Sequence, residues 1–274
     1  MKNRVWRAVM GLMAGAGLLL AQEAAPVAKQ PQPKSKQEVE ALQAMFSAQD
    51  PDGRIAAAQN LITKFADTEF KALALQLIAM SYEQKGDADN MIVYSERVLE
   101  ADPQNYASML MISRALAQRT KEFDLDKEEK LGRAEKMAHQ AQEALKTTPK
   151  PRPDITDDQW AEAKKDFNSQ ALESLGLIAM VRKKYDVAIK EFNAAIEGSS
   201  NPDPATMVRL GAVYNLAGKH DEAIGILDKV MALPEVHPQI KQIAQAERVR
   251  AMQAKGGAKP ATPPPAEPAK PANP

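Results

Sequence analysis

The sequence predicts an all-α protein made of stacked pairs of short helices. The clearest pair lies between Pro204 and Glu235, where apolar residues recur three and four positions apart in two runs, 207–216 and 223–230. A short turn that contains Gly218 separates the runs, so we expect a helical hairpin. The composition agrees, because much of the apolar content is alanine and only 5% of the residues are aromatic, which suits close-packed helices.

Small residues in this stretch predict how its two helices meet. Gly211 and Ala223 have little or no side chain, so the helices can approach closely at these positions. Leu210, Tyr214 and Leu227 then fill the space around the contact. The pair is therefore expected to be tightly packed.

The same pattern of a large apolar residue, a small residue, a turn and a late proline recurs upstream in 75–103 and in 172–202. The recurrence is regular: Ile78 and Ile112 lie 34 residues apart, and Leu175 and Leu210 lie 35 apart. A fixed period of this length indicates a helical repeat protein.

Leu-Gly followed by Tyr three residues on, then a turn, an alanine, a bulky residue four later and a proline resembles the tetratricopeptide repeat. Two positions depart from that family, since Met207 stands where Trp is usual and His220 where an aromatic is usual. The resemblance covers roughly residues 38–255. It implies a right-handed superhelical solenoid of about five helix–turn–helix pairs with a C-terminal capping helix, and a concave face that binds protein segments.

The expected pairs follow from the apolar stripes and turns. The first, 38–48 with 53–66, is expected to be a degenerate first repeat, with an N-terminal cap as the alternative. The others are 73–85 with 88–101, 106–119 with 131–147, Thr156–Val181 with the helix after Lys183-Lys184, and 207–216 with 223–230. The segment 238–255 is expected to cover the last apolar face, as the end of a solenoid requires.

Two features of the middle region leave alternatives open. The charged stretch Lys121–Lys130 lacks a helical apolar period, so we expect a solvated insertion in the turn of the third pair, either passive or an interaction loop. Trp160, early in the long helix from Thr156, is expected to be buried against the preceding pair. The alternative is an exposed aromatic that binds a partner.

Residues 1–21 have the layout of a secretory signal peptide, with a basic start, an apolar run at 9–20 and the small residue Ala21. The run is shorter than the roughly 20 residues of a membrane-spanning helix, so we expect cleavage after Ala21 and no membrane span afterwards. An uncleaved inner-membrane anchor is the alternative. The remaining divisions are a flexible linker at 22–37, the repeat domain at 38–255 and a disordered Pro-rich tail at 256–274. An exported helical chain without Cys is typical of the bacterial envelope, either periplasmic or secreted.

The residues that carry chemistry are few and scattered. His139, His220 and His237 are the only histidines, they lack the spacing of metal ligands, and the chain has no Cys. The sequence has no glycine-rich phosphate loop and no nucleophile elbow. The 36 basic residues are balanced by 36 acidic ones. We therefore expect no enzyme activity, no cofactor, no metal and no nucleic-acid partner.

The remaining prediction is a binding face on the first helix of each pair, opposite its packing residues. Methionines on this face suit adaptable contact with an apolar peptide or helix of another envelope protein. Because Asn215 is the one Lys or Asn at the matching positions, the carboxylate clamp of some family members is expected to be absent. The candidate residues, here called the candidate face, are Leu77, Met80, Glu83, Gln84, Leu110, Met111, Arg114, Gln118, Glu173, Leu177, Met180, Val208, Arg209 and Asn215.

Two functions fit this organisation, because the same repeat serves many unrelated partners. In the first, the chain is a non-catalytic scaffold or adaptor whose groove holds a segment of a partner protein. In the second, it is a structural spacer or assembly factor that fills its own groove and is tethered through its Pro-rich termini. A groove closed by residues 239–254 would favour the second.

Overall fold

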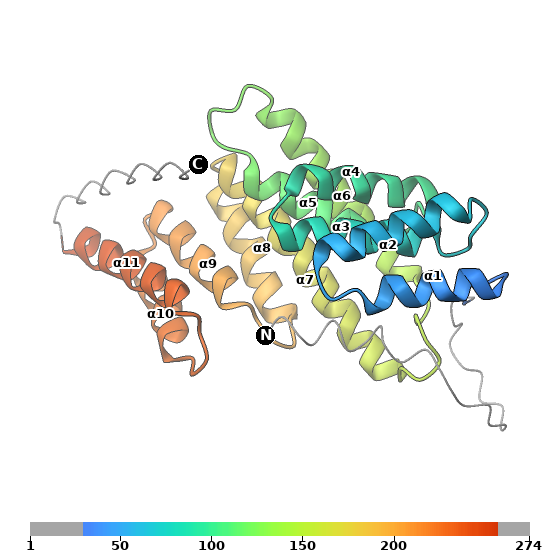
Figure 1. Ribbon diagram of the computed structural model, residues 1–274. Coiled ribbons are helices and arrows are strands. Elements are labelled where there is room, and N and C mark those ends of the chain that lie inside the picture. The colour runs from blue at the N-terminus through green and yellow to red at the C-terminus, as the bar shows by residue number, and fades with distance from the viewer. Residues whose placement is uncertain (1–29, 257–274) are drawn as a thin grey trace, which may run out of the picture.

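The computed structural model describes residues 30–256, which form eleven helices and no strand (Figure 1). The predicted signal peptide, the linker up to residue 29 and the tail from residue 257 lie outside the described residues. None of the described helices is long and apolar enough to cross a membrane. The all-α fold class predicted from the sequence is confirmed.

The helices form five successive pairs and a final single helix, as predicted. Each pair packs internally, and each first helix also packs against the pair before it, so the chain is a continuous stack. Figure 1 shows α1 and α2 at one end of this stack and α10 and α11 at the other. The elements are α1 (Lys36–Ser47), α2 (Pro51–Lys64), α3 (Lys71–Lys85), α4 (Ala88–Ala101), α5 (Tyr106–Arg119), α6 (Lys127–Thr147), α7 (Asp157–Val181), α8 (Tyr185–Gly198), α9 (Pro204–Leu216), α10 (His220–Ala232) and α11 (Pro238–Lys255).

Local capping signals explain where helices begin. Asp50 precedes Pro51 at the start of α2, and its carboxylate accepts a hydrogen bond from the Gly53 N–H at 2.8 Å. Thr156 and Gln159 form a capping box at the start of α7, where each side chain bonds the backbone N–H of the other. The helix start predicted at Thr156 is therefore confirmed.

The turns inside three of the pairs use a residue with left-handed backbone geometry. Gly86 follows α3 with a φ of 75°, and Gly218 follows α9 with a φ of 73°. The turn between α7 and α8 has no glycine, and Lys183 adopts a φ of 59° there. A residue with a Cβ is strained in this region by about 1–2 kcal/mol.

Two glycines allow the helices of a pair to touch. A Cβ at Gly211 of α9 would lie 2.7 Å from Leu227 of α10, and one at Gly176 of α7 would lie 2.8 Å from Phe192 of α8. Leu227, Phe192 and Ala223 are fully buried, so these contacts form a close-packed interior. The close approach predicted at Gly211 is confirmed.

The third pair differs from the prediction at its charged insertion. α6 begins at Lys127, so the irregular loop comprises only residues 120–126, and the end of the predicted insertion Lys121–Lys130 is helical. Glu128 and Glu129 lie in the first turn of α6, where negative charge favours the positive end of the helix dipole. Because this turn is charged on all sides, it has no apolar period that could reveal a helix.

Trp160 is buried, as expected, in the first half of the long helix α7. Its indole N–H donates a hydrogen bond to the Thr148 carbonyl oxygen at 3.2 Å. Its ring centroid lies 6.4 Å from those of both Tyr106 and Phe167. This aromatic cluster joins the extended part of α7 to the third pair.

Candidate partner-binding face

The apolar members of the candidate face are mostly in the core. Leu110, Met111, Leu177 and Val208 are buried against neighbouring helices. The prediction that these four side chains are open to a partner is therefore wrong. Helices such as α5 and α7 pack directly on each other, so the next repeat covers part of the presumed outer face.

Three apolar candidates keep part of their surface. Leu77 and Met80 of α3 and Met180 of α7 are half-buried at the margins of core clusters. Their remaining surface is available to an apolar side chain of another molecule. The apolar part of the candidate face is thus reduced to these three residues.

The charged candidates pair with one another across repeats. Arg114 of α5 forms an ion pair with Glu83 of α3, and Arg209 of α9 forms one with Glu173 of α7. The partners are 31 and 36 positions apart in the sequence, so each ion pair ties one repeat to another. Charge therefore alternates in sign from α3 through α5 and α7 to α9.

Two amide candidates are also engaged. Asn215 of α9 donates hydrogen bonds to the backbone oxygen and the carboxylate of Glu247 of α11, at 2.9 and 3.0 Å. Gln84 accepts one from Arg54 of α2 at 3.3 Å. Gln118 is exposed near the end of α5. α11 thus reaches the α9 end of the candidate face, while the α3 and α5 part has exposed polar groups.

On the candidate face, the folded structure changes the pKa of the Glu173 carboxyl group. Burial raises the pKa of the Glu173 carboxyl above its usual value, and the positive charge of Arg209 offsets this only in part. Arg114 also acts on this carboxylate, so the charges of α5, α7 and α9 influence one another. The protonation of Glu173 is therefore linked to the packing of three repeats.

A second set of ion pairs was missed by the sequence reasoning. In four places a Lys or Arg at the end of a helix, or just after it, contacts an Asp in the first turn of the helix before it. The helix that carries the basic residue is the first of a pair in three places and the final helix α11 in the fourth. These pairs are Lys85–Asp52, Arg119–Asp89, Lys219–Asp186 and Lys255–Asp221. Acidic charge near a helix N-terminus and basic charge near a C-terminus both favour the helix dipole. The separations of 33, 30, 33 and 34 residues are the signal that could have revealed them.

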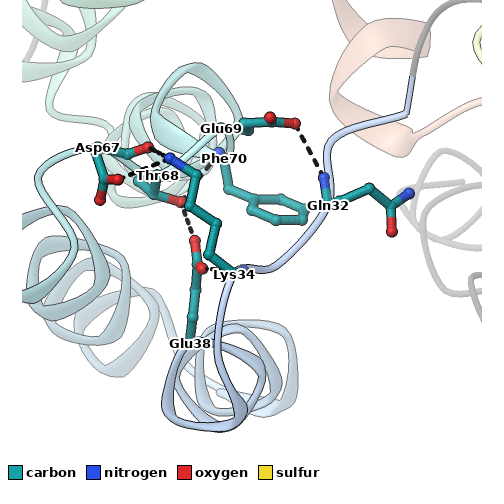
Figure 2. A network of polar contacts seen from close by, with 7 residues as sticks. All are labelled: Gln32, Lys34, Glu38, Asp67, Thr68, Glu69 and Phe70. Atoms are coloured by element: carbon teal, nitrogen blue, oxygen red, sulfur yellow. Dashed lines mark hydrogen bonds and ion pairs between the residues drawn. The ribbon is translucent and has the colours of Figure 1, made fainter.

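The chain leading into α1 is bound to the turn between α2 and α3, as Figure 2 shows. The Lys34 ammonium donates to the Asp67 backbone oxygen at 2.6 Å and to its carboxylate at 2.8 Å. The buried Glu38 carboxylate accepts from the Lys34 N–H and from the Thr68 hydroxyl, both at 2.6 Å. Lys36 and Gln37, at the end of the predicted linker, already belong to α1.

Two hollows of the surface lie away from the candidate face. One of about 260 Å³ lies between the α4–α5 turn and α6 beside His139, and one of about 520 Å³ lies at the α7–α8 turn. Neither is lined by a residue of the candidate face. Within residues 30–256, no three His, Asp or Glu side chains converge as a metal site requires.

Comparison with known protein families identifies one repeat. A family model described as Tetratricopeptide repeat matches residues 72–105, which span nearly all of α3 and all of α4. A sequence search of curated proteins found no match. The matched segment includes Leu77, Met80, Glu83 and Gln84 of the candidate face.

Comparison with solved structures gives matches at low sequence identity. TTC0263, a thermophilic TPR protein of Thermus thermophilus, is 13% identical with a TM-score of 0.52, over 78% of this chain and 96% of that chain. A tetratricopeptide repeat protein from Parabacteroides merdae ATCC 43184 is 14% identical with a TM-score of 0.44, over 81% and 89% of the two chains. The similarity to TTC0263 concerns the fold alone. Residues 72–105 therefore match a tetratricopeptide repeat, and most of the chain has a fold similar to that of a solved TPR protein.

Proposed function

We propose that this chain is a protein-interaction scaffold without catalytic activity, which holds a segment of another protein on the face of α3, α5, α7 and α9. The observation that carries the proposal is the row of alternating charges from Glu83 to Arg209, beside the half-buried Met80 and Met180. A helix or extended peptide with apolar side chains and charges of both signs matches this surface. The repeat match supports the proposal, since stacked helical repeats present extended binding surfaces.

The partner is proposed to be another protein of the bacterial envelope. This part rests on the sequence of residues 1–21, which has the layout of an export signal. Mass spectrometry of the protein purified from cells that export it tests this step. Loss of the residues up to Ala21 is expected, whereas an intact N-terminus would favour the membrane-anchored alternative.

In-cell photo-crosslinking tests the binding face. A photoreactive residue replaces Met80 in one variant and Met180 in another, and a control variant carries it at Val93 of α4, which is 48% exposed. We expect a discrete adduct from both methionine positions and none from Val93, and mass spectrometry then identifies the partner. If the variants are folded and exported but neither methionine position gives an adduct, the proposed face is wrong.

A pair of arginine variants gives a matched second test. Arg114 and Arg119 both lie on α5 and both form an ion pair with an acidic residue of the preceding pair of helices, Glu83 and Asp89. Only Arg114 belongs to the candidate face. Arg114→Ala is expected to reduce the Met80 adduct, and Arg119→Ala is expected to leave it unchanged. If both variants reduce the Met80 adduct to the same extent, the loss reflects lower stability of the protein and not the loss of a binding residue.

The structural spacer is the second candidate, and specific observations favour it. Part of the candidate face is covered by the chain itself. α11 contacts Asn215, and neighbouring helices bury four further residues of the face, Leu110, Met111, Leu177 and Val208. A spacer gives no adduct at the methionine positions. The same crosslinking experiment therefore distinguishes the two functions.

A further inference from the structure

The loop between α5 and α6, residues 120–126, carries two large apolar side chains that face solvent. Phe123 is 88% exposed and Leu125 is fully exposed, and no other large apolar side chain among the described residues is as open. The turns inside the other four pairs take only two or three residues, so this loop is a local extension. Clustered exposed apolar side chains are typical of an interaction site.

The loop is held in shape by its own polar residues. The Asp124 carboxylate accepts a hydrogen bond from the Lys121 N–H at 3.1 Å, and the Asp124 carbonyl oxygen accepts one from the Lys127 N–H at 3.2 Å. Lys130 forms an ion pair with Asp126 at 2.8 Å. Because the backbone is fixed in this way, less conformational entropy is lost when the two apolar side chains bind.

A hollow of about 520 Å³ lies beside the loop, lined by the α7–α8 turn and the end of α9. Its apolar side chains Val187 and Leu216 are 46% and 52% exposed. Glu122 of the loop forms an ion pair with Lys183 of the turn. The loop and the hollow are therefore neighbours on the same edge of the stack.

The loop and the hollow carry net charges of opposite sign, and each has two exposed large apolar side chains. Residues 121–126 contain three acidic side chains and one basic side chain, whereas the charged residues that line the hollow are Lys183, Lys184 and Asp186. In the single chain the loop does not fill the hollow, since both sets of apolar side chains are exposed. We propose that two copies of this chain associate about a two-fold axis, with Phe123 and Leu125 of each copy in the hollow of the other.

The side-by-side position of the two surfaces favours two-fold symmetry. An isologous contact uses one self-complementary patch, and a loop beside its complementary hollow is such a patch. Every contact is then made twice. The seven residues of the loop and the seven that line the hollow are fewer than the roughly 20–30 residues that each partner contributes to a stable interface, so the dimer is weak and depends on concentration. This self-association does not depend on the function proposed for the α3, α5, α7 and α9 face.

Disulfide trapping between two different variants tests the proposal. The chain has no native Cys, so any disulfide comes from the introduced residues. Leu125→Cys and Val187→Cys are made in separate full chains that carry tags of different size, mixed, and oxidised mildly. The control replaces Val187→Cys by Val93→Cys, at a valine of α4 that is 48% exposed, compared with 46% for Val187. We expect the heterodimer of the first mixture to form at least about tenfold faster than that of the control mixture, because docking raises the effective concentration.

Sedimentation velocity of the chain without Cys substitutions gives an independent measurement. The wild-type protein is expected to change from monomer to dimer between micromolar and submillimolar concentration, and Phe123→Ser with Leu125→Ser is expected to weaken the dimer at least about tenfold. These two side chains are exposed, so their replacement leaves the fold intact. Equal trapping in the two mixtures, or a wild-type protein that stays monomeric throughout, overturns the proposal.

Discussion

Replacing Gly211 with alanine tests the closest contact between paired helices. A Cβ at this position would lie 2.7 Å from Cγ and Cδ2 of Leu227 and 3.1 Å from Cδ1, well inside the usual contact distance of carbon atoms. Leu227 is completely buried, so it has no solvent space into which to move. Either α9 and α10 must separate or Leu227 must leave its rotamer.

Two effects of opposite sign determine how Gly211→Ala changes the free energy of unfolding. Overpacking a well-filled core costs about 1–3 kcal/mol, mainly through such displacements. Replacing glycine with alanine inside a helix stabilises the folded protein by about 1 kcal/mol, because alanine has the higher helix propensity. We therefore expect Gly211→Ala to lower the free energy of unfolding by about 1 kcal/mol net, with the clash outweighing the propensity.

Gly225→Ala is the matched control, because it changes helix propensity without creating a clash with another side chain. Gly225 lies inside α10, and a Cβ there would meet no atom within 4 Å apart from the nearby backbone of its own helix. Its replacement is expected to raise stability by up to about 1 kcal/mol. Urea unfolding followed by far-UV circular dichroism measures both variants. If Gly211→Ala is as stable as Gly225→Ala, the contact with Leu227 is not tight and the packing argument is refuted.

Three further predictions concern single side chains. Lys183→Gly relieves the strain of a left-handed residue with a Cβ, but it also removes the exposed ion pair with Glu122. We expect it to raise the unfolding free energy by roughly 0.5 kcal/mol in a urea titration, less than the full strain because the ion pair is lost and glycine is freer in the unfolded chain. Thr156→Ala removes the capping box with Gln159 and is expected to lower the unfolding free energy by about 1 kcal/mol. Thr156→Ser retains the cap and is expected to retain most of the stability. For Glu173, burial raises the pKa in the folded protein above the ordinary value of 4.5, so the folded state binds the proton more tightly and stability falls as pH rises through the folded pKa. As pH rises through the folded pKa, we expect the unfolding free energy of Glu173→Gln to increase relative to that of the wild type. A difference between the two proteins that does not depend on pH would contradict the role assigned to burial.

The positions of the helices follow from the sequence because their signals are local. The cap at Thr156 and the glycine at position 86 each act within one turn of the chain, and each lies where the structure begins or ends a helix. The second helix is an exception, because it is expected from residue 53 and begins at Pro51, where Asp50 is its cap. The contact between Gly211 and Leu227 also follows, since two antiparallel helices joined by a short turn have few ways to meet.

The candidate face depends on distances between repeats, which no local signal carries. Met111 has the same helical periodicity as an exposed residue on the outer side of α5, yet it packs with Ala79 and Met91 of the preceding pair. Whether such a side chain is covered depends on how closely successive pairs stack. The ion pair of Arg114 with Glu83 depends on the same stacking distance, so it was not predicted from the sequence.

The charges of the candidate face serve the stack as well as the proposed binding, and this limits how a partner can use them. A partner that contacts Arg114 competes with Glu83, the residue that joins α3 to α5. Because a surface ion pair contributes only about 0–1 kcal/mol, exchanging one such pair for another changes the free energy of binding little. Burial of the open surface of Leu77, Met80 and Met180, at about 25 cal/mol per Å², must then supply most of the affinity, while the charges set the orientation of the bound segment. Met80→Ser is therefore expected to weaken partner capture more than a rise in salt concentration does, and a partner that salt releases while Met80→Ser still binds it would show that the charges, not the methionines, hold it.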